Sequence, residues 1–360
     1  MATVPRLAVL HCPQWPVVAA GCAPGEPVAV VHANRVVARS SVAAAAGVRV
    51  GQRRREAQSR CPELRLVQRN VVADARAFHP VADAVAALVP RLEVTRPGVL
   101  TFATRGPSRY FGGDESMASR VLAAAEDALG DTTAHIGRPG IGVADGRFAA
   151  GVAARRALRI DGRVEVVSVD ASPTFLAPLT LRWLTDVGEV AAEQVDLFTR
   201  LGLVRLGQLA ELTEPDVLAR FGWSGALAHR MAGGLDDRLP GTEEPPPGLA
   251  VAQHFDTPVA HLDAVVFTAR QLAEQLIGTL GGQGRVCTQV AVTAETEHGE
   301  RTERLWSMSG GFSVATLVER VRWQLDGWGE PTAGVTLLVL EPTEVRADDG
   351  IQLGLWGGRT

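Results

Sequence analysis

The last third of the chain has a clear order of strands and helices, and this order restricts the possible fold more than any other feature. Short β-branched runs alternate with longer segments whose apolar residues recur every three or four positions. The pattern predicts strand, helix, strand, strand, helix and strand over Val251–Phe255, Leu262–Leu280, Val286–Ala294, Arg301–Trp306, Ser313–Trp328 and Gly334–Leu340. This β-α-β-β-α-β succession is the split βαβ order, which predicts a small domain of its own.

The first half of the chain predicts a larger body of mixed strands and helices. Strands are expected at Leu7–Leu10, Pro27–His32, Val36–Arg39, Leu92–Val94, Val99–Phe102, around 135–143 and at Val164–Val169. One helix is expected over Asp74–Val89, and a second begins with Asp114-Glu115 and ends before Gly130. The prediction is therefore an α+β protein of several domains.

Short helices separated by glycines follow this body. Leu184–Gly188 and Phe198–Leu209 predict a helix-hairpin-helix module, whose turn usually presents backbone N–H groups to a DNA phosphate. Asp186 and Glu189 flank the turn and would repel that phosphate. A stiff, acidic and proline-rich run over Leu239–Gly248 is the clearest linker in the chain.

The basic side chains are all arginines, 36 of them, and the chain has no lysine. This excludes a P-loop, a Schiff-base lysine and a lysine clamp on a triphosphate. The four cysteines and eight histidines show no metal-ligand spacing, so we expect reduced thiols and no zinc site. No apolar run is long enough to span a bilayer, and a cytoplasmic protein is expected.

Positive charge is concentrated locally although the net charge is −4. Between Arg35 and Arg69 nine arginines stand against two glutamates, a patch that could face nucleic-acid phosphates. The candidate DNA-binding residues are Arg53, Arg54 and Arg55 in this patch, and Arg285, Arg301 and Arg304 on the predicted strands of the last domain. The alternative for each of them is a solvated surface arginine.

The C-terminus carries a short apolar anchor on a polar tail. Its residues are Gln352, Leu353, Leu355, Trp356 and Gly357, just after an acidic run. The spacing resembles the peptide with which bacterial DNA polymerases and repair proteins grip the β sliding clamp, where the leucines and the aromatic residue fill a pocket. The alternative is a C-terminal strand whose apolar residues return to the core.

Taken in order, these segments resemble the Y-family, or translesion, DNA polymerases over nearly the whole chain. Ala46–Gly51 with Glu56-Ala57 and Cys61–Leu64 is similar to the finger signature of that family, and Gly142–Ala144 with Arg147–Ala149 and Ala153-Ala154 to its late-palm motif. The resemblance implies a palm over 1–20 and 73–170, fingers over 21–72, a helix-hairpin-helix thumb over 171–238, a linker over 239–250, a split-βαβ little finger over 251–343 and a flexible tail over 344–360.

The resemblance also shows where this sequence departs from an active polymerase. Phosphoryl transfer in that family needs two Mg²⁺ ions held by carboxylates. The matching positions here are Cys12, followed two residues later by Gln14, and the pair Pro97-Gly98. The residues that grip the triphosphate fall at Ser41, Ala44 and Leu158. We therefore expect no catalytic residue, no bound metal and no cofactor.

A polymerase-like sequence that lacks the metal-binding carboxylates and ends in a clamp-type tail is similar to the ImuB branch of the Y family. That resemblance implies a nucleoid-associated adaptor whose partners are the β sliding clamp, an error-prone replicative-type polymerase subunit, a RecA-like accessory protein of the ImuA type and, weakly, primer-template DNA. Two alternatives stay open: a passive DNA-binding protein without clamp contact, and an active polymerase that has recruited Glu93 or Asp114.

Overall fold

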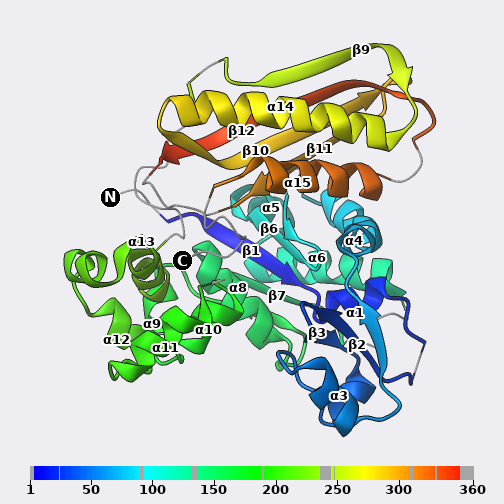
Figure 1. The fold of residues 1–360 in the computed structure, drawn as a ribbon. Coiled ribbons are helices and arrows are strands. Elements are labelled where there is room, and N and C mark those ends of the chain that lie inside the picture. Colours follow the sequence, from blue (N-terminus) through cyan, green and yellow to red (C-terminus); the bar gives the residue numbers. More distant parts are fainter. Residues whose placement is uncertain are drawn as a thin grey trace. The chain divides into compact units, whose positions relative to one another are not determined.

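A computed structural model describes residues 4–23, 25–89, 92–130, 137–188, 190–235, 245–246, 248–308, 311–328 and 331–348. The chain divides into two compact units, Met1–Asp237 and Arg238–Thr360 (Figure 1). The division falls next to the linker that the sequence predicts. No helix in the described ranges is long and apolar enough to cross a membrane.

The first unit is built on strands in the order β8-β7-β1-β6-β5. Their bounds are β1 Arg6–His11, β5 Glu93–Arg96, β6 Val99–Ala103, β7 Gly140–Asp145 and β8 Val164–Val166. The central strand β1 pairs antiparallel with both β6 and β7, and β8 runs parallel to β7. Residues from Leu7 to Leu10 are all buried, as expected for a strand covered on both faces.

Helices pack closely on this sheet. They are α1 Trp15–Ala19, α4 Val71–Ala86, α5 Arg105–Phe111, α6 Asp114–Leu129 and α8 Arg147–Ala157. The approach of α8 to β7 explains one glycine, because a Cβ at Gly142 would lie 2.2 Å from the backbone nitrogen of Ala154. The expected helix from Asp114 to Leu129 is confirmed, with Met117, Val121 and Leu122 buried.

Residues 28–68 form a separate three-stranded sheet in the order β3-β2-β4. It contains β2 Val28–His32, β3 Arg35–Arg39 and β4 Arg65–Gln68, with α2 Ser41–Ala45 and α3 Arg54–Arg60 between the last two. Its small core is mainly alanine and valine, including Ala29, Val36 and Ala57. The sequence predicts β2 and β3 but not β4.

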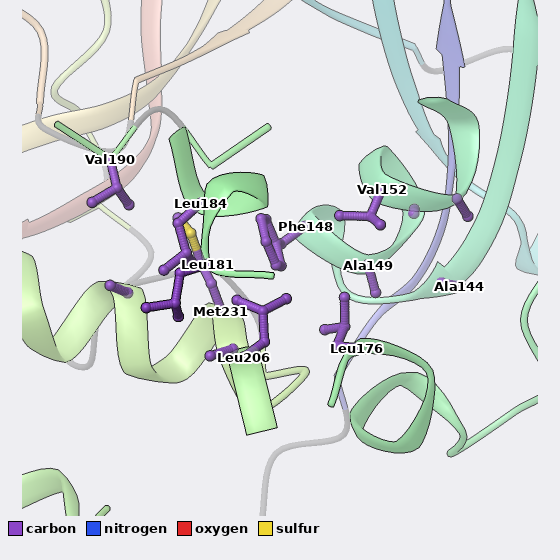
Figure 2. Packing of buried hydrophobic residues seen from close by; sticks show 14 of the residues in the cluster. Ala144, Phe148, Ala149, Val152, Leu176, Leu181, Leu184, Val190, Leu206 and Met231 are labelled. Atoms are coloured by element: carbon purple, nitrogen blue, oxygen red, sulfur yellow. The ribbon is translucent and has the colours of Figure 1, made fainter. Parts of the chain in front are cut away.

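A run of helices follows in the first unit: α9 Ser172–Leu176, α10 Arg182–Asp186, α11 Ala192–Arg200, α12 Leu206–Ala210 and α13 Glu214–Ala232. Their buried face joins α8 in one hydrophobic cluster, where Phe148 of α8 lies near Leu184 and Met231 (Figure 2). The cluster attaches the helical segment to the sheet, since Leu7 and Val9 of β1 belong to it as well.

The second unit has the expected split βαβ order. Its elements are β9 Val251–Val259, α14 Leu262–Gly282, β10 Arg285–Thr296, β11 Arg301–Ser307, α15 Val314–Gly327 and β12 Val335–Ala347. The strands lie in the order β11-β10-β12-β9 with every pair antiparallel. Trp306 of β11 is buried and donates its indole N–H to Gln324 of α15 at 3.0 Å, so α15 covers the Trp306 face of the sheet.

One predicted boundary is wrong. The expected tail begins at 344, but β12 continues to Ala347 and pairs there with Arg285. Val345 and Arg346 are buried in this extension. Pro342 interrupts the apolar alternation of the strand, and this break made the sequence pattern end too early.

Candidate functional site

The two sequence segments that lack the expected carboxylates lie side by side in the structure. Cys12 follows the last residue of β1, and Gly98 lies in the turn between β5 and β6. The backbone N–H of Cys12 donates to the carbonyl oxygen of Gly98 at 2.8 Å. The fold therefore brings together the positions that would form one metal site in an active polymerase.

The side chain of Trp15 occupies the space beside Gly98. Gly98 has a positive φ of 92°, and a Cβ added there would lie 2.7 Å from the Cβ of Trp15 and 3.1 Å from the carbonyl oxygen of Cys12. Trp15 is buried, packs edge-to-face on Phe78 and donates its indole N–H to the backbone oxygen of Asp74 at 2.7 Å. A carboxylate side chain at position 98 has no room without displacing Trp15.

The electrostatics at the end of β1 also oppose a bound cation. Burial raises the pKa of the Cys12 thiol to about 12, so this thiol is neutral at physiological pH. Burial, with Arg155 and Arg96 nearby, holds the pKa of His11 well below its usual range. Both arginines therefore lie close enough to His11 to act on it electrostatically.

Glu93 was one of two acids that the sequence left open as a relocated metal ligand. It is buried on β5, and both of its carboxylate oxygens accept hydrogen bonds from Arg147, at 2.8 Å and 2.7 Å. Thr95 lies beside the pair. A bidentate arginine already neutralises this carboxylate and occupies both oxygens.

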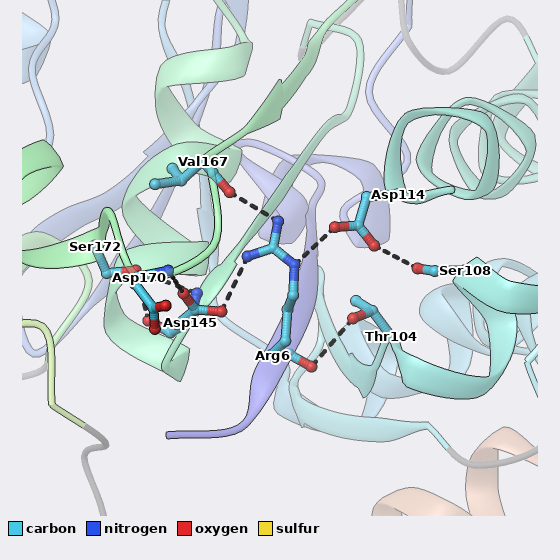
Figure 3. A network of polar contacts seen from close by, with 8 residues as sticks. All are labelled: Arg6, Thr104, Ser108, Asp114, Asp145, Val167, Asp170 and Ser172. Carbon is cyan, nitrogen blue, oxygen red and sulfur yellow. Dashed lines mark hydrogen bonds and ion pairs between the residues drawn. The ribbon is translucent and has the colours of Figure 1, made fainter. Parts of the chain in front are cut away.

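Asp114, the second such acid, belongs to a different network (Figure 3). Arg6 at the start of β1 donates to Asp114 at 2.7 Å, to Asp145 at 3.0 Å and to the carbonyl oxygen of Val167 at 2.8 Å. Asp114 also accepts from Ser108. One arginine thus joins β1, β7 and α6 and donates hydrogen bonds to two carboxylates.

The Arg6 network lies far from the place filled by Trp15. Arg6 and Cys12 are six positions apart on an extended strand, which corresponds to about 20 Å. Asp114 and Asp145 therefore cannot complete a site at Cys12. Within the described ranges, no three His, Cys, Asp or Glu side chains are grouped so that they could hold a metal ion. The donors present do not fit the two-metal site of an active polymerase.

The three positions expected to grip a triphosphate carry a serine, an alanine and a leucine, none of which is charged. Ser41 begins α2 and is exposed, and Ala44 lies on the same helix. Leu158 caps the C-terminus of α8. Gln14 accepts a hydrogen bond from the backbone of Arg39 at 2.8 Å, so its side chain links β3 to α1.

Comparison with known proteins agrees with this architecture. Residues 23–155 match the sequence model of the impB/mucB/samB family, abbreviated IMS. DNA polymerase IV 1 of Mesorhizobium japonicum is 25% identical over 70% of this chain and 55% of its own length. DNA polymerase IV of Methanoculleus marisnigri is 28% identical over 42% of this chain and 41% of its own. The chain spans about half the length of these curated relatives.

Solved structures extend the likeness to both units. An insertion ternary complex of Dbh DNA polymerase covers 95% of this chain and 98% of its own, with a TM-score of 0.52 at 11% identity. DinB from Sulfolobus solfataricus covers 95% and 99%, with a TM-score of 0.52 at 12% identity. The chain has the fold of the Y-family DNA polymerases.

The basic patch predicted in the first unit is exposed around α3. Arg53 caps α3, Arg54 and Arg55 form its first turn, and all three side chains reach solvent. Two other arginines of the patch are engaged in ion pairs, Arg65 with Glu26 and Arg69 with Asp74. The exposed part of the patch is therefore centred on α3.

The three arginines predicted in the second unit do not share one surface. Arg304 pairs with Val292 on the sheet face that Trp306 turns toward α15, and it is half-buried. Arg301 lies on the opposite face and contacts Glu303 at 2.7 Å. Arg285 begins β10 and is half-buried. Arg301 and Arg304 therefore lie on opposite faces of the sheet, because alternate residues of a strand face opposite sides. DNA binding by any one of these three arginines stays a prediction.

The charged residues on the face that carries Arg301 are mainly acidic. Register places four glutamates on that side of the strands: Glu295, Glu303, Glu341 and Glu344. Polar side chains continue across it, since Thr343 donates to Gln289 at 2.9 Å and Gln289 donates to Ser307 at 3.0 Å. An arginine surrounded by glutamates is a poor surface for DNA phosphates.

The clamp-type residues Gln352, Leu353, Leu355, Trp356 and Gly357 lie outside the described residues.

Three structural roles could not be identified from the sequence. Trp15 occupies the space beside Gly98, Arg147 pairs with Glu93, and Arg6 links two aspartates. Arg147 lies inside the late-palm motif, and this motif was the one local sequence signal for any of the three roles. The other two roles depend on contacts between residues distant in sequence.

Proposed function

We propose that this chain is a non-catalytic, polymerase-like adaptor of the ImuB type that acts in damage-induced translesion synthesis and mutagenesis. The observation that supports it most is the contact between Cys12 and Gly98, where Trp15 fills the space that metal-binding carboxylates need. Glu93 and Asp114 do not replace those carboxylates, because arginines hold both of them. Without metal ligands the body keeps the polymerase fold but has no means to activate a primer oxygen.

The proposed domains follow from the Y-family fold. We assign the palm to 1–20 and 73–170, the fingers to 21–72, the thumb to 171–238 and the little finger to 251–347. The last boundary is moved from 343 because β12 continues to Ala347. A body with this fold can hold a primer-template or a partner without transferring a nucleotide, since fold does not fix function.

The C-terminal peptide would tether this body to the β sliding clamp. Gln352 would hydrogen-bond the rim of the clamp pocket, while Leu353, Leu355 and Trp356 would supply the desolvated contacts that dominate such interfaces. Tethering raises the local concentration of whatever else the adaptor holds. The cargo we propose is an error-prone replicative-type polymerase subunit, with a RecA-like ImuA-type protein as a further partner.

Clamp capture by the full chain tests this function. A variant with Leu353, Leu355 and Trp356 all changed to alanine should lose at least about tenfold in affinity for purified clamp, because hot-spot side chains each contribute about 1 kcal/mol or more. Its thermal melting should match that of the unchanged chain. Clamp binding equal to that of the unchanged chain would show that the peptide is not the tether.

An active polymerase is the second candidate, and the relatives called DNA polymerase IV favour it. Primer extension on an undamaged template separates the two. Incorporation that disappears when Glu93 or Asp114 is changed to its amide would establish an enzyme with relocated carboxylates. A passive DNA binder, favoured by the exposed Arg53–Arg55, would bind DNA but would not bind clamp.

A further inference from the structure

A short helix that the sequence analysis did not predict carries the most exposed aromatic residue in the described part of the chain. Tyr110 on α5 is 83% exposed, and it is the single tyrosine of the sequence. Phe111 follows it and is half-buried. Burying a large aromatic side chain contributes a few kcal/mol, so an exposed ring is available to stack on a partner.

The aromatic pair has a defined geometry. The rings of Tyr110 and Phe111 meet edge-to-face with centroids 4.8 Å apart. The guanidinium carbon of Arg120, on α6, lies 5.5 Å from the centroid of Phe111. Phe111 is therefore fixed between its neighbour and a cation, while the Tyr110 ring is left open to solvent.

Positive charge surrounds these rings. Arg105, Arg109 and Arg120 are all exposed, and none of them forms an ion pair within the described part of the chain. The segment from Arg105 to Arg120 contains two acids, of which Asp114 is held by Arg6 and Glu115 is exposed. We call Arg105, Arg109, Tyr110, Phe111 and Arg120 the α5 patch.

We propose that the α5 patch binds single-stranded DNA. An exposed aromatic face beside unpaired arginines is the combination that such strands need, because bases stack on the ring and arginines meet the phosphates. A duplex keeps its base faces stacked inside the helix, so duplex DNA could use the arginines but not Tyr110.

The proposed site is separate from the contact between Cys12 and Gly98. The α5 helix comes after the end of β6, whereas Gly98 precedes its first residue, so the length of that strand, roughly 16 Å, lies between them. The inference goes beyond the adaptor function and holds whether or not the palm is catalytic. The α5 patch would be a site at which the first unit holds a DNA strand during repair.

Photochemical cross-linking locates the contact directly. The full chain is irradiated with an oligothymidylate that carries one 5-iodouracil, then digested with trypsin, which cuts only at arginines because the chain has no lysine. The peptide Tyr110–Arg120 contains both rings of the patch. Mass spectrometry should find the nucleotide on Tyr110. Adducts confined to other peptides, or no adduct at all, would overturn the proposal.

Substitution at Tyr110 tests stacking. Tyr110→Ala should weaken binding of the oligothymidylate, followed by fluorescence anisotropy, by about tenfold, while Tyr110→Phe should stay within about twofold because it keeps the ring. Phe267→Ala, which removes another exposed aromatic in the second unit, is the matched control and should change nothing. Equal affinity of Tyr110→Ala and the unchanged chain would contradict the proposal.

The arginines are tested by the dependence of affinity on salt. Each phosphate contact with single-stranded DNA contributes a slope of about 0.7 in log affinity against log salt concentration, so Arg105→Ala with Arg109→Ala should reduce the slope by about 1.4. An unchanged slope would refute the phosphate contacts. Clamp capture by these variants should remain normal, which separates failure of this site from failure of the adaptor function.

Discussion

At the scale of single residues, Gly98 gives the strongest support for the proposal that the chain is non-catalytic. Its φ of 92° is strained for any other residue, and a Cβ would meet Trp15 at 2.7 Å. Gly51 is a matched comparison, because its φ is 91° but nothing lies within 4 Å of the place where a Cβ would stand. Backbone strain and steric crowding together exclude an acidic side chain at position 98.

Gly98→Ala should therefore destabilise the first unit by about 3 kcal/mol, and Gly51→Ala by about 1 kcal/mol. The first change adds a clash to the backbone strain, while the second adds strain alone. Urea unfolding followed by tryptophan fluorescence measures both. Equal losses in the two variants would mean that Trp15 does not fill the space beside Gly98.

Cys12 gives a second prediction at this scale. Its folded-state pKa of about 12 lies above the ordinary value of 9.0, so its contribution to stability is present below about pH 9 and is lost as the pH rises toward 12. At pH 8 iodoacetamide should modify the half-buried Cys22 at least about 100-fold faster than Cys12. Peptide mass spectrometry follows both. Comparable rates would show an open site at the end of β1.

At the scale of elements, local signals decided which segments the sequence could predict. The helix α6 was found because two glycines precede it, two acids begin it and Gly130 ends it. The helix α5 was missed because Gly106, Pro107 and Ser108 resemble a turn. The Arg6 network and the packing of Trp15 beside Gly98 could not be predicted, since they join residues between about 60 and 160 positions apart.

The extension of β12 provides a prediction for an element. A chain that ends at Asp349 keeps the whole strand, whereas one that ends at Thr343 loses the buried Val345 and Arg346. The shorter chain should lose at least about 3 kcal/mol of stability in the second unit, and the longer chain almost none. Urea unfolding compares them. Equal stability would mean that residues 344–347 do not belong to the sheet.

At the scale of the whole molecule, the chain has the fold of a Y-family polymerase, and we propose that its chemistry differs. The split βαβ order, the strand β1 and the absence of carboxylates at Cys12 and Pro97-Gly98 were all accessible from the sequence. The side chain that occupies the space of those carboxylates, Trp15, could not be predicted from the sequence, because its position depends on tertiary packing. The likeness to solved polymerase structures covers the fold. The sequence departs from the Y-family pattern at Cys12 and Pro97-Gly98.

Primer extension by the full chain tests the central claim most directly. The chain is incubated with an undamaged primer-template, all four deoxynucleoside triphosphates and either Mg²⁺ or Mn²⁺. We expect no extended primer with either ion, because arginines hold Glu93 and Asp114 and Trp15 occupies the remaining space. Extension that is lost in the Glu93→Gln variant would contradict this account.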